Sequence, residues 1–163
     1  MLRRLLFVGL CSSPLITHAA DQTILGNTLL LKNPSGPALR RIAVKAKEFP
    51  SFNTVVGNPT TDGASVTINV DGASPSEQTF AMPASSWRGD ATNGFSYQDP
   101  TGANGPVKRA QIKHKRGTFA LKVAIDGRLG TVDVVPPNPG TGGCVLFSIG
   151  EGDSYSVSSP PAR

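Results

Sequence analysis

The sequence predicts an all-β fold, an antiparallel β-sandwich or a partly closed barrel, with about 8–10 short strands. Short runs of alternating apolar and polar residues recur along the chain, and long helical periodicity is absent. Gly (18 residues) and Pro (14 residues) are plentiful and separate these runs as turn residues. Strands joined by turns are therefore the expected building units of the domain.

Residues 1–20 predict a signal peptide of the Sec type. Arg3 and Arg4 form its positive start, residues 5–10 form its apolar core, and small residues precede a cleavage site before about Asp21. Cys11 lacks the small preceding residue that a lipidated cysteine requires. The apolar run is too short for a transmembrane helix, and no later run is long enough. The expected location is secreted, or periplasmic and outer envelope.

The remaining chain is expected to form a single all-β domain at residues 21–157, with a loose C-terminal tail at 158–163. Removing Arg3 and Arg4 leaves 14 of the 16 basic residues against 11 acidic ones, so the net charge falls from +5 to +3. This mild charge favours solubility and does not by itself indicate nucleic acid. Cys144 is then the only cysteine, so no internal disulfide is expected.

Four strands are predicted in the first half, at residues 28–32, 40–47, 64–70 and 78–82. In the second of them, Ile42, Val44 and Ala46 are expected to face inward. Residues 49–62 are expected to form a long loop, because they contain several turn signals. Trp87 is expected to fill the core from a short connection.

Residues 106–135 are the clearest piece of structure and predict three strands joined by two tight turns. Residues 119–125 alternate strictly between apolar residues and small or charged ones. Asp126-Gly127 follows directly and suits a two-residue type I′ turn. This predicts a hairpin in which a strand at 129–135 returns beside residues 119–125, with its valines on the same buried face.

Three further strands are predicted around this stretch. A strand at 94–98 precedes it, and a loop rich in Pro and Gly at 136–143 follows it. Residues 144–149 form an apolar run that predicts a central strand. Residues 154–157 are expected to pair at an edge of a sheet.

Residues 107–115 predict a strand with a row of cations on one face, followed by a turn at Arg116-Gly117. The candidate binding residues are Lys108, Arg109, Lys113, Lys115 and Arg116. They are suited to phosphate or sulfate groups of an anionic surface polymer, such as lipopolysaccharide. The same charges are typical of a solvated face, or of an edge strand that avoids aggregation. Stacking aromatic residues are not interleaved with them, so specific nucleic-acid binding is not expected.

Nucleophilic catalysis has few candidate residues. After removal of the signal peptide, Cys144 and His114 are the only cysteine and histidine, so a small hydrolase would have to use one of them. No Gly-x-Ser-x-Gly motif is present, and one His with one Cys cannot supply a usual zinc site. We therefore expect a non-enzymatic protein without a cofactor.

Calcium and polysaccharide are two further ligand classes for which the sequence has candidate residues. Loop residues with oxygen ligands are Asp62, Asp71, Glu77, Asp90, Asn93 and Asp99. Their spacing matches neither an EF-hand nor a β-roll repeat, and Asp and Asn also occupy turns for backbone reasons. Phe95 and Tyr97 share one face of a strand near Trp87, so they form either part of the core or a stacking platform of a polysaccharide-binding module.

Several strand and turn signatures follow one another along the chain. They are Leu29-Leu30-Leu31-Lys32-Asn33-Pro34, Arg40-Arg41-Ile42, Gly63-Ala64-Ser65-Val66, Phe80-Ala81-Met82-Pro83-Ala84, Gly94-Phe95-Ser96-Tyr97-Gln98-Asp99 and Asn104-Gly105-Pro106-Val107-Lys108. In this order the chain resembles an uncharacterised family of secreted all-β modules from myxobacteria and related proteobacteria. The resemblance implies the fold and the compartment, and the family has no established activity. The expected role is binding, adhesion or structure in the cell envelope, with an anionic surface polymer or another envelope protein as partner.

Overall fold

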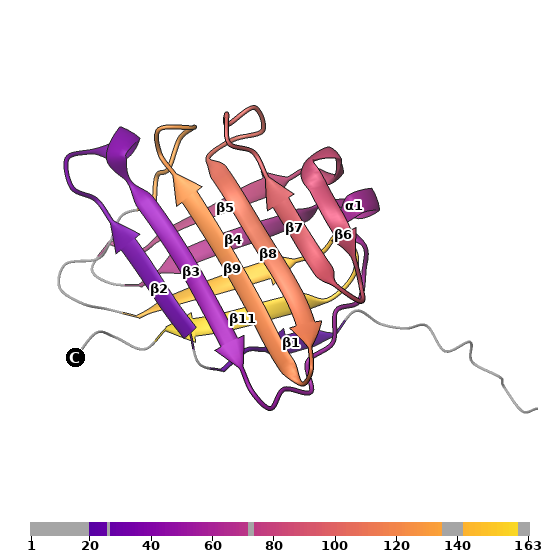
Figure 1. Ribbon diagram of the computed structural model, residues 1–163. Coiled ribbons are helices and arrows are strands. Elements are labelled where there is room, and N and C mark those ends of the chain that lie inside the picture. The colour runs from indigo at the N-terminus through magenta and orange to yellow at the C-terminus, as the bar shows by residue number, and fades with distance from the viewer. Residues whose placement is uncertain (1–19, 26, 72–73, 135–141, 160–163) are drawn as a thin grey trace, which may run out of the picture.

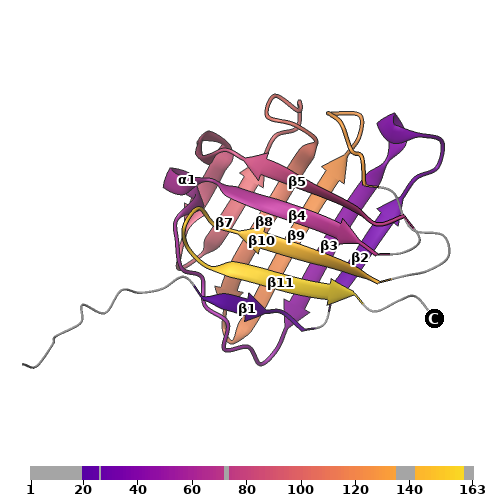
Figure 2. The ribbon, with the colours of Figure 1, turned by 180° about the vertical axis from the view of Figure 1, so that it is seen from behind.

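Alternating side chains give each strand one apolar face, and two sheets bury these faces against each other (Figures 1 and 2). The computed structural model describes residues 20–25, 27–71, 74–134 and 142–159. The predicted signal peptide up to residue 19, the loop at 135–141 and the tail at 160–163 lie outside these residues. The two layers form an all-β sandwich, which confirms the predicted fold class.

The six-stranded sheet faces the viewer in Figure 1 and has the order β2-β3-β9-β8-β7-β6. All its neighbouring strands are antiparallel. Its strands are β2 (Asn27–Lys32), β3 (Arg41–Glu48), β6 (Trp87–Asp90), β7 (Gly94–Gln98), β8 (Val107–Lys115) and β9 (Thr118–Asp126). The long strands β3, β9 and β8 lie side by side at its centre.

The five-stranded sheet is the near layer in Figure 2 and has the order β1-β11-β10-β4-β5. Its strands are β1 (Asp21–Thr23), β4 (Ala64–Val70), β5 (Ser76–Met82), β10 (Gly143–Ser148) and β11 (Ser154–Ser159). The predicted central strand is confirmed, because β10 lies in the middle of this sheet. The predicted edge strand is wrong, because β1 pairs in parallel with the outer side of β11. The last strand also runs to Ser159, two residues into the predicted tail.

The core lies between the layers and contains the inward residues of both sheets. Phe119 and Leu121 of β9 and Val66 and Phe147 of the other sheet are all fully buried there. Burying each side chain of this size contributes roughly 1.5–3 kcal/mol before the entropy of folding is subtracted. Trp87 is 4% exposed and its ring lies 6.3 Å from that of Phe147. The prediction that Trp87 fills the core is therefore confirmed, although it begins strand β6 rather than lying in a connection.

The predicted hairpin at Asp126-Gly127 is wrong. Strand β9 already pairs with β3 on one side and β8 on the other, so no edge is left for a returning strand. The chain instead turns at 126–129, where the Leu129 N–H donates to the Asp126 carbonyl over 3.0 Å and the Gly127 N–H donates to the Arg40 carbonyl over 2.8 Å. This turn directs the chain out of the six-stranded sheet.

The valines at 132 and 134 are buried as predicted, but the segment at 131–134 is not a strand. Val132 and Val134 are fully buried in the core. The Gln78 side chain of β5 replaces a strand partner: its Nε2 donates to the Thr131 carbonyl over 3.1 Å, and its Oε1 accepts from the Asp133 N–H over 2.7 Å. The alternating valines are thus buried, while the side-chain amide of Gln78 supplies hydrogen-bond partners to the backbone of this segment.

The turn with two positive φ values lies between β8 and β9. Arg116 has a φ of 52° and Gly117 a φ of 71°. Lys115 pairs with Thr118, so these two residues form the two-residue loop. Positive φ at both central positions is the requirement of a type I′ turn. The tight turn predicted at Arg116-Gly117 is therefore confirmed.

We expect Arg116→Asn to stabilise the protein by about 0.5–1 kcal/mol. A side chain in the left-handed region is strained, and Asn tolerates this conformation better than Arg. The midpoint of urea unfolding should therefore rise. A lower midpoint would show that the Arg116 side chain makes stabilising contacts that outweigh the strain.

Short helical turns interrupt the loops. Residues 49–62, which were predicted as a loop, contain α1 (Pro59–Asp62), and Asn58 caps it by accepting from the Thr60 N–H over 3.0 Å. Two 3₁₀ turns occupy Pro37–Leu39 and Ala84–Ser86.

Candidate functional site: a basic outer face

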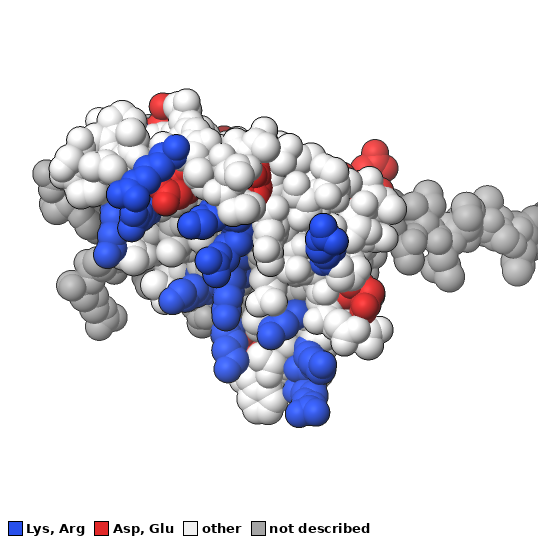
Figure 3. All heavy atoms as spheres, turned by 45° about the horizontal axis from the view of Figure 1, so that its top comes forward, with Lys and Arg blue, Asp and Glu red and all other residues white. Residues whose placement is uncertain are grey.

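The basic residues are segregated to one layer of the sandwich. Every Lys and Arg among the described residues lies in a strand of the six-stranded sheet or within two residues of one, and none lies in a strand of the five-stranded sheet. Figure 3 shows one face of the molecule, on which many Lys and Arg side chains lie near one another with few acidic side chains among them. The surface formed by the outward residues of β3, β9, β8 and β7 is called the basic face below.

Strand register concentrates positive charge at the centre of the basic face. Lys45 of β3 lies directly opposite Lys122 of β9, and Gln111 of β8 lies on the other side of Lys122. Like charges in directly opposed positions destabilise a sheet. Small residues, Ala43, Ala120 and Ala124, occupy neighbouring outward positions of these strands. The lysine side chains therefore project beyond the short alanine side chains around them, and a ligand has access to their ammonium groups.

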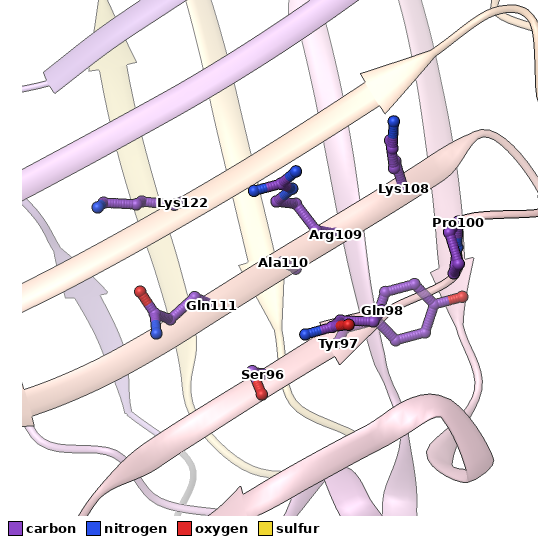
Figure 4. Close-up of a pocket in the computed structure, with 9 residues that line it drawn as sticks. All are labelled: Ser96, Tyr97, Gln98, Pro100, Lys108, Arg109, Ala110, Gln111 and Lys122. Carbon is purple, nitrogen blue, oxygen red and sulfur yellow. The ribbon is translucent and has the colours of Figure 1, made fainter.

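A first hollow of about 400 Å³ lies over β7, β8 and β9. Figure 4 shows Arg109, Gln111 and Lys122 above the sheet, with Ser96 and Gln98 beside them on β7. Lys108 also lines this hollow and lies at a β-bulge, where the register between β8 and β9 shifts. The hollow combines cations with amide and hydroxyl groups, which can bind the oxygen atoms of an anion.

A second hollow of about 540 Å³ lies on the same face, toward the β8–β9 turn. Its basic residues are Lys47, Lys113, Lys115, Arg116 and Lys122. Lys122 lines both hollows, so they adjoin along β9. A ligand longer than a single anion can therefore contact cations from three neighbouring strands.

Of the residues predicted as a binding set, Lys108 and Arg109 line the first hollow and Lys113, Lys115 and Arg116 line the second. The edge-strand alternative is wrong for this segment, because β8 pairs with β7 and β9. Sequence reasoning missed three cations of the same face. They are Lys45, Lys47 and Lys122. The alternation of basic residues with Ile42, Val44 and Ala46 was an available signal for two of them.

The acidic residues of this sheet lie at strand ends and are engaged there. Asp126 lies 3.8 Å from the Arg41 guanidinium. The Glu48 carboxylate accepts from the Ser51 hydroxyl and the Asn53 amide. Hydrogen bonds from the Asn93 side chain and backbone hold the pKa of Asp90 below its usual value. The centre of the basic face is therefore left with its positive charge.

The two candidate catalytic residues lie in different layers. Cys144 lies on β10 at a position that alternates with the buried Val145, so it points to the outer side of the five-stranded sheet. His114 lies on β8 on the same side as the buried Ile112, and its ring centroid lies 6.2 Å from that of Phe119. The described structure therefore does not bring these residues together as a nucleophile and base.

The aromatic pair on β7 belongs to the core. Phe95 is 3% exposed and Tyr97 is 1% exposed, and the Tyr97 ring lies 5.5 Å from that of Trp87. The core interpretation is therefore confirmed, and the alternative of a sugar-stacking platform is wrong for these residues.

Two of the loop carboxylates that are candidate calcium ligands accept hydrogen bonds from backbone N–H groups of their own loops. Asp90 accepts from the N–H groups of Thr92 and Asn93, and Asp99 accepts from those of Ala103 and Asn104. The bonds from Asn104 and Ala103 lower the pKa of Asp99 despite its burial. Within the ranges that the structure describes, no group of three or more His, Cys, Asp or Glu residues could hold a metal ion.

No helix in the described ranges has the length and apolarity needed to span a membrane. Comparison of the chain with protein-family models, curated proteins and solved structures found no match. The resemblance to the secreted bacterial modules therefore stays a prediction.

Proposed function

We propose that this protein is a secreted or cell-envelope binding module, without enzymatic activity, that binds an anionic surface polymer through its basic face. One observation carries the proposal: the described Lys and Arg residues are confined to one layer of the sandwich. Their arrangement leaves like charges opposed across β3 and β9. A polymer with regularly spaced phosphate, sulfate or carboxylate groups would neutralise this repulsion.

The spacing of the cations suits an extended chain. Outward residues that alternate along β8, such as Arg109, Lys113 and Lys115, are spaced in multiples of roughly 7 Å, and neighbouring strands lie about 4.8 Å apart. The guanidinium of Arg109 can bind an anionic group in a bidentate way, while the lysines act as point charges. The same geometry would accept several related polyanions, so affinity is expected to follow charge density more than sugar identity.

Retention on immobilised heparin, compared with a neutral dextran matrix, tests this proposal. We expect salt-dependent retention on heparin alone, and lower eluting salt for a variant with Lys113, Lys115 and Arg116 changed to Ser. The matched control changes Lys32, Arg88 and Arg128 to Ser, which removes the same charge outside both hollows. Equal losses in the two triple variants would show that net charge, and not the basic face, determines retention.

A further inference from the structure

The loop after β3 exposes two aromatic side chains at one end of the sandwich. Phe49 is 72% exposed and Phe52 is 97% exposed. Leu25 is 65% exposed and lies at the same end, because β2 begins beside it and pairs its first residue with Ala46. Large apolar side chains that are exposed together indicate an interaction surface. Residues 49–52 and the adjacent β8–β9 turn are called the aromatic tip below, and they form the lowest part of the molecule in Figure 1.

Hydrogen bonds fix the position of this tip. The Ser51 N–H donates to the Gly117 carbonyl over 2.9 Å, which joins the loop to the β8–β9 turn. The Asn53 amide donates to the Glu48 carboxylate over 3.0 Å and to the Thr23 carbonyl over 3.0 Å. The exposed rings therefore extend from a loop that is bonded on both sides.

Basic residues surround the aromatic tip. Lys115 and Arg116 lie next to or in its turn, and Lys47 lies two residues before Phe49. All three line the second hollow of the basic face. Glu48 is the acidic residue of this segment, and its carboxylate is bonded within the loop. Apolar side chains next to cations are the pattern by which peripheral proteins bind anionic lipid surfaces.

We propose that the aromatic tip binds an anionic lipid bilayer, with Phe49 and Phe52 entering the boundary between headgroups and acyl chains. Lys47, Lys115 and Arg116 then contact the lipid phosphates. This goes beyond the proposed function, because a soluble polyanion gives the phenylalanine rings no apolar phase to enter. The two interactions share cations, and only the lipid interaction needs the aromatic side chains.

Sedimentation with vesicles tests the proposal. We expect binding to vesicles of phosphatidylcholine mixed with phosphatidylglycerol, and little binding to phosphatidylcholine alone. Phe52→Ser should weaken this binding about tenfold, and Phe49→Ser by a similar factor, as expected for losing a buried Phe from the bilayer. The control is Leu146→Ser, which removes an exposed apolar residue of β10 on the opposite layer.

Heparin retention of the same variants separates this proposal from the proposed function. Unchanged heparin retention with lost vesicle binding supports the aromatic tip. Unchanged vesicle binding in both Phe variants would overturn it, as would wild-type dimers that become monomers in Phe52→Ser. Vesicle binding without heparin retention would overturn the proposed function alone. Phe52→Trp gives a second readout, since its fluorescence should shift to the blue on anionic vesicles while the buried Trp87 stays unchanged.

A buried carboxylate, that of Asp153, lies beside the start of the described chain. The Asp153 carboxylate is 1% exposed and accepts from the Ala20 N–H over 3.0 Å. Its other donors are Gln22 Nε2, Thr54 Oγ1, the Val56 N–H and Tyr155 Oη. All these donors are neutral, whereas buried carboxylates are usually paired with a charge.

We propose that signal-peptide removal leaves Ala20 as the first residue and that its α-ammonium group pairs with Asp153. A signal peptidase would use water to hydrolyse the peptide bond before Ala20, leaving a carboxylate on Ala19 and a protonated amine on Ala20. Thr17 and Ala19 supply the small residues that such a site requires. This site lies one residue before the predicted boundary, and the inference rests on the proposed secretion.

The intact mass of the protein exported from a bacterial host tests the cleavage position. A chain that begins at Ala20 is expected, whereas one that begins at Asp21 would overturn the proposal because it lacks the Ala20 donor. The ion pair is tested separately by acetylating the Ala20 amine, which removes its charge and keeps an N–H. The acetylated chain should unfold at a lower urea concentration than the free amine, and equal midpoints would overturn the ion pair.

Discussion

Lys122→Glu is expected to weaken heparin binding at least about tenfold, the largest effect of a single change on the basic face. Lys122 lines both hollows, so its reversal removes a cation and adds a repulsive charge where they adjoin. The same change places a carboxylate directly opposite Lys45. An opposite-charge pair across strands is stabilising by roughly 0.2–1 kcal/mol, so the variant should unfold at a slightly higher urea concentration.

Arg128→Glu is the matched control, because it changes the net charge by the same amount at an exposed site outside both hollows. We expect it to keep most of the heparin affinity. Weaker binding together with higher stability in Lys122→Glu would identify a residue selected for binding at the expense of the fold. Lower stability and weaker binding together would contradict this assignment and indicate a structural role for the lysine.

Asp153→Ala is expected to destabilise the fold by roughly 3–5 kcal/mol. The carboxylate joins the start of the chain, the segment at 54–56 and β11 through its hydrogen bonds. Without it, several buried donors lose their acceptor at once. Burial and the neighbouring Asp153 raise the pKa of Tyr155 well above its usual value, so this phenol is protonated in the folded protein and can donate to the carboxylate.

Urea unfolding measures this effect, and Glu151→Ala is the control. Glu151 lies in the same turn between β10 and β11, but it is exposed. Its removal should change the free energy of unfolding by less than about 0.5 kcal/mol. A small effect of Asp153→Ala, close to that of the control, would show that water can satisfy the donors around this carboxylate.

The fold class follows from the sequence because side-chain alternation is a local signal. The inward positions predicted in β3, Ile42, Val44 and Ala46, are buried as expected. Pairing between distant strands is not encoded in such a pattern. Asp126-Gly127 has the composition of a hairpin turn, yet β3 pairs with β9 and leaves no edge for it. The three-residue strand β1 is too short for any period to be visible, and its pairing with β11 joins opposite ends of the chain.

Part of the candidate site could also be predicted from the sequence, and part could not. The cations of β8 could be predicted because they alternate along one strand. Lys45 and Lys122 lie 77 positions apart in the sequence, and only the pairing of β3 with β9 places them opposite each other. The loop at 49–62 was predicted, but the exposure of Phe49 and Phe52 within it was not, because Phe is usually buried. The hydrogen bonds of Ser51 and Asn53 to Glu48 that hold this loop are also not visible as a pattern in the sequence.

Salt dependence of heparin affinity tests the polyanion proposal most directly. The logarithm of the association constant should fall linearly with the logarithm of the salt concentration, as cations of the basic face release counterions from the polymer. A variant with Lys45, Lys113 and Lys122 changed to Gln should reduce the slope by about 1 per lysine. The triple control Lys32, Arg88 and Arg128 to Gln should leave most of the slope. A slope that is unchanged in the first variant, or equally reduced in both, would contradict binding through the basic face.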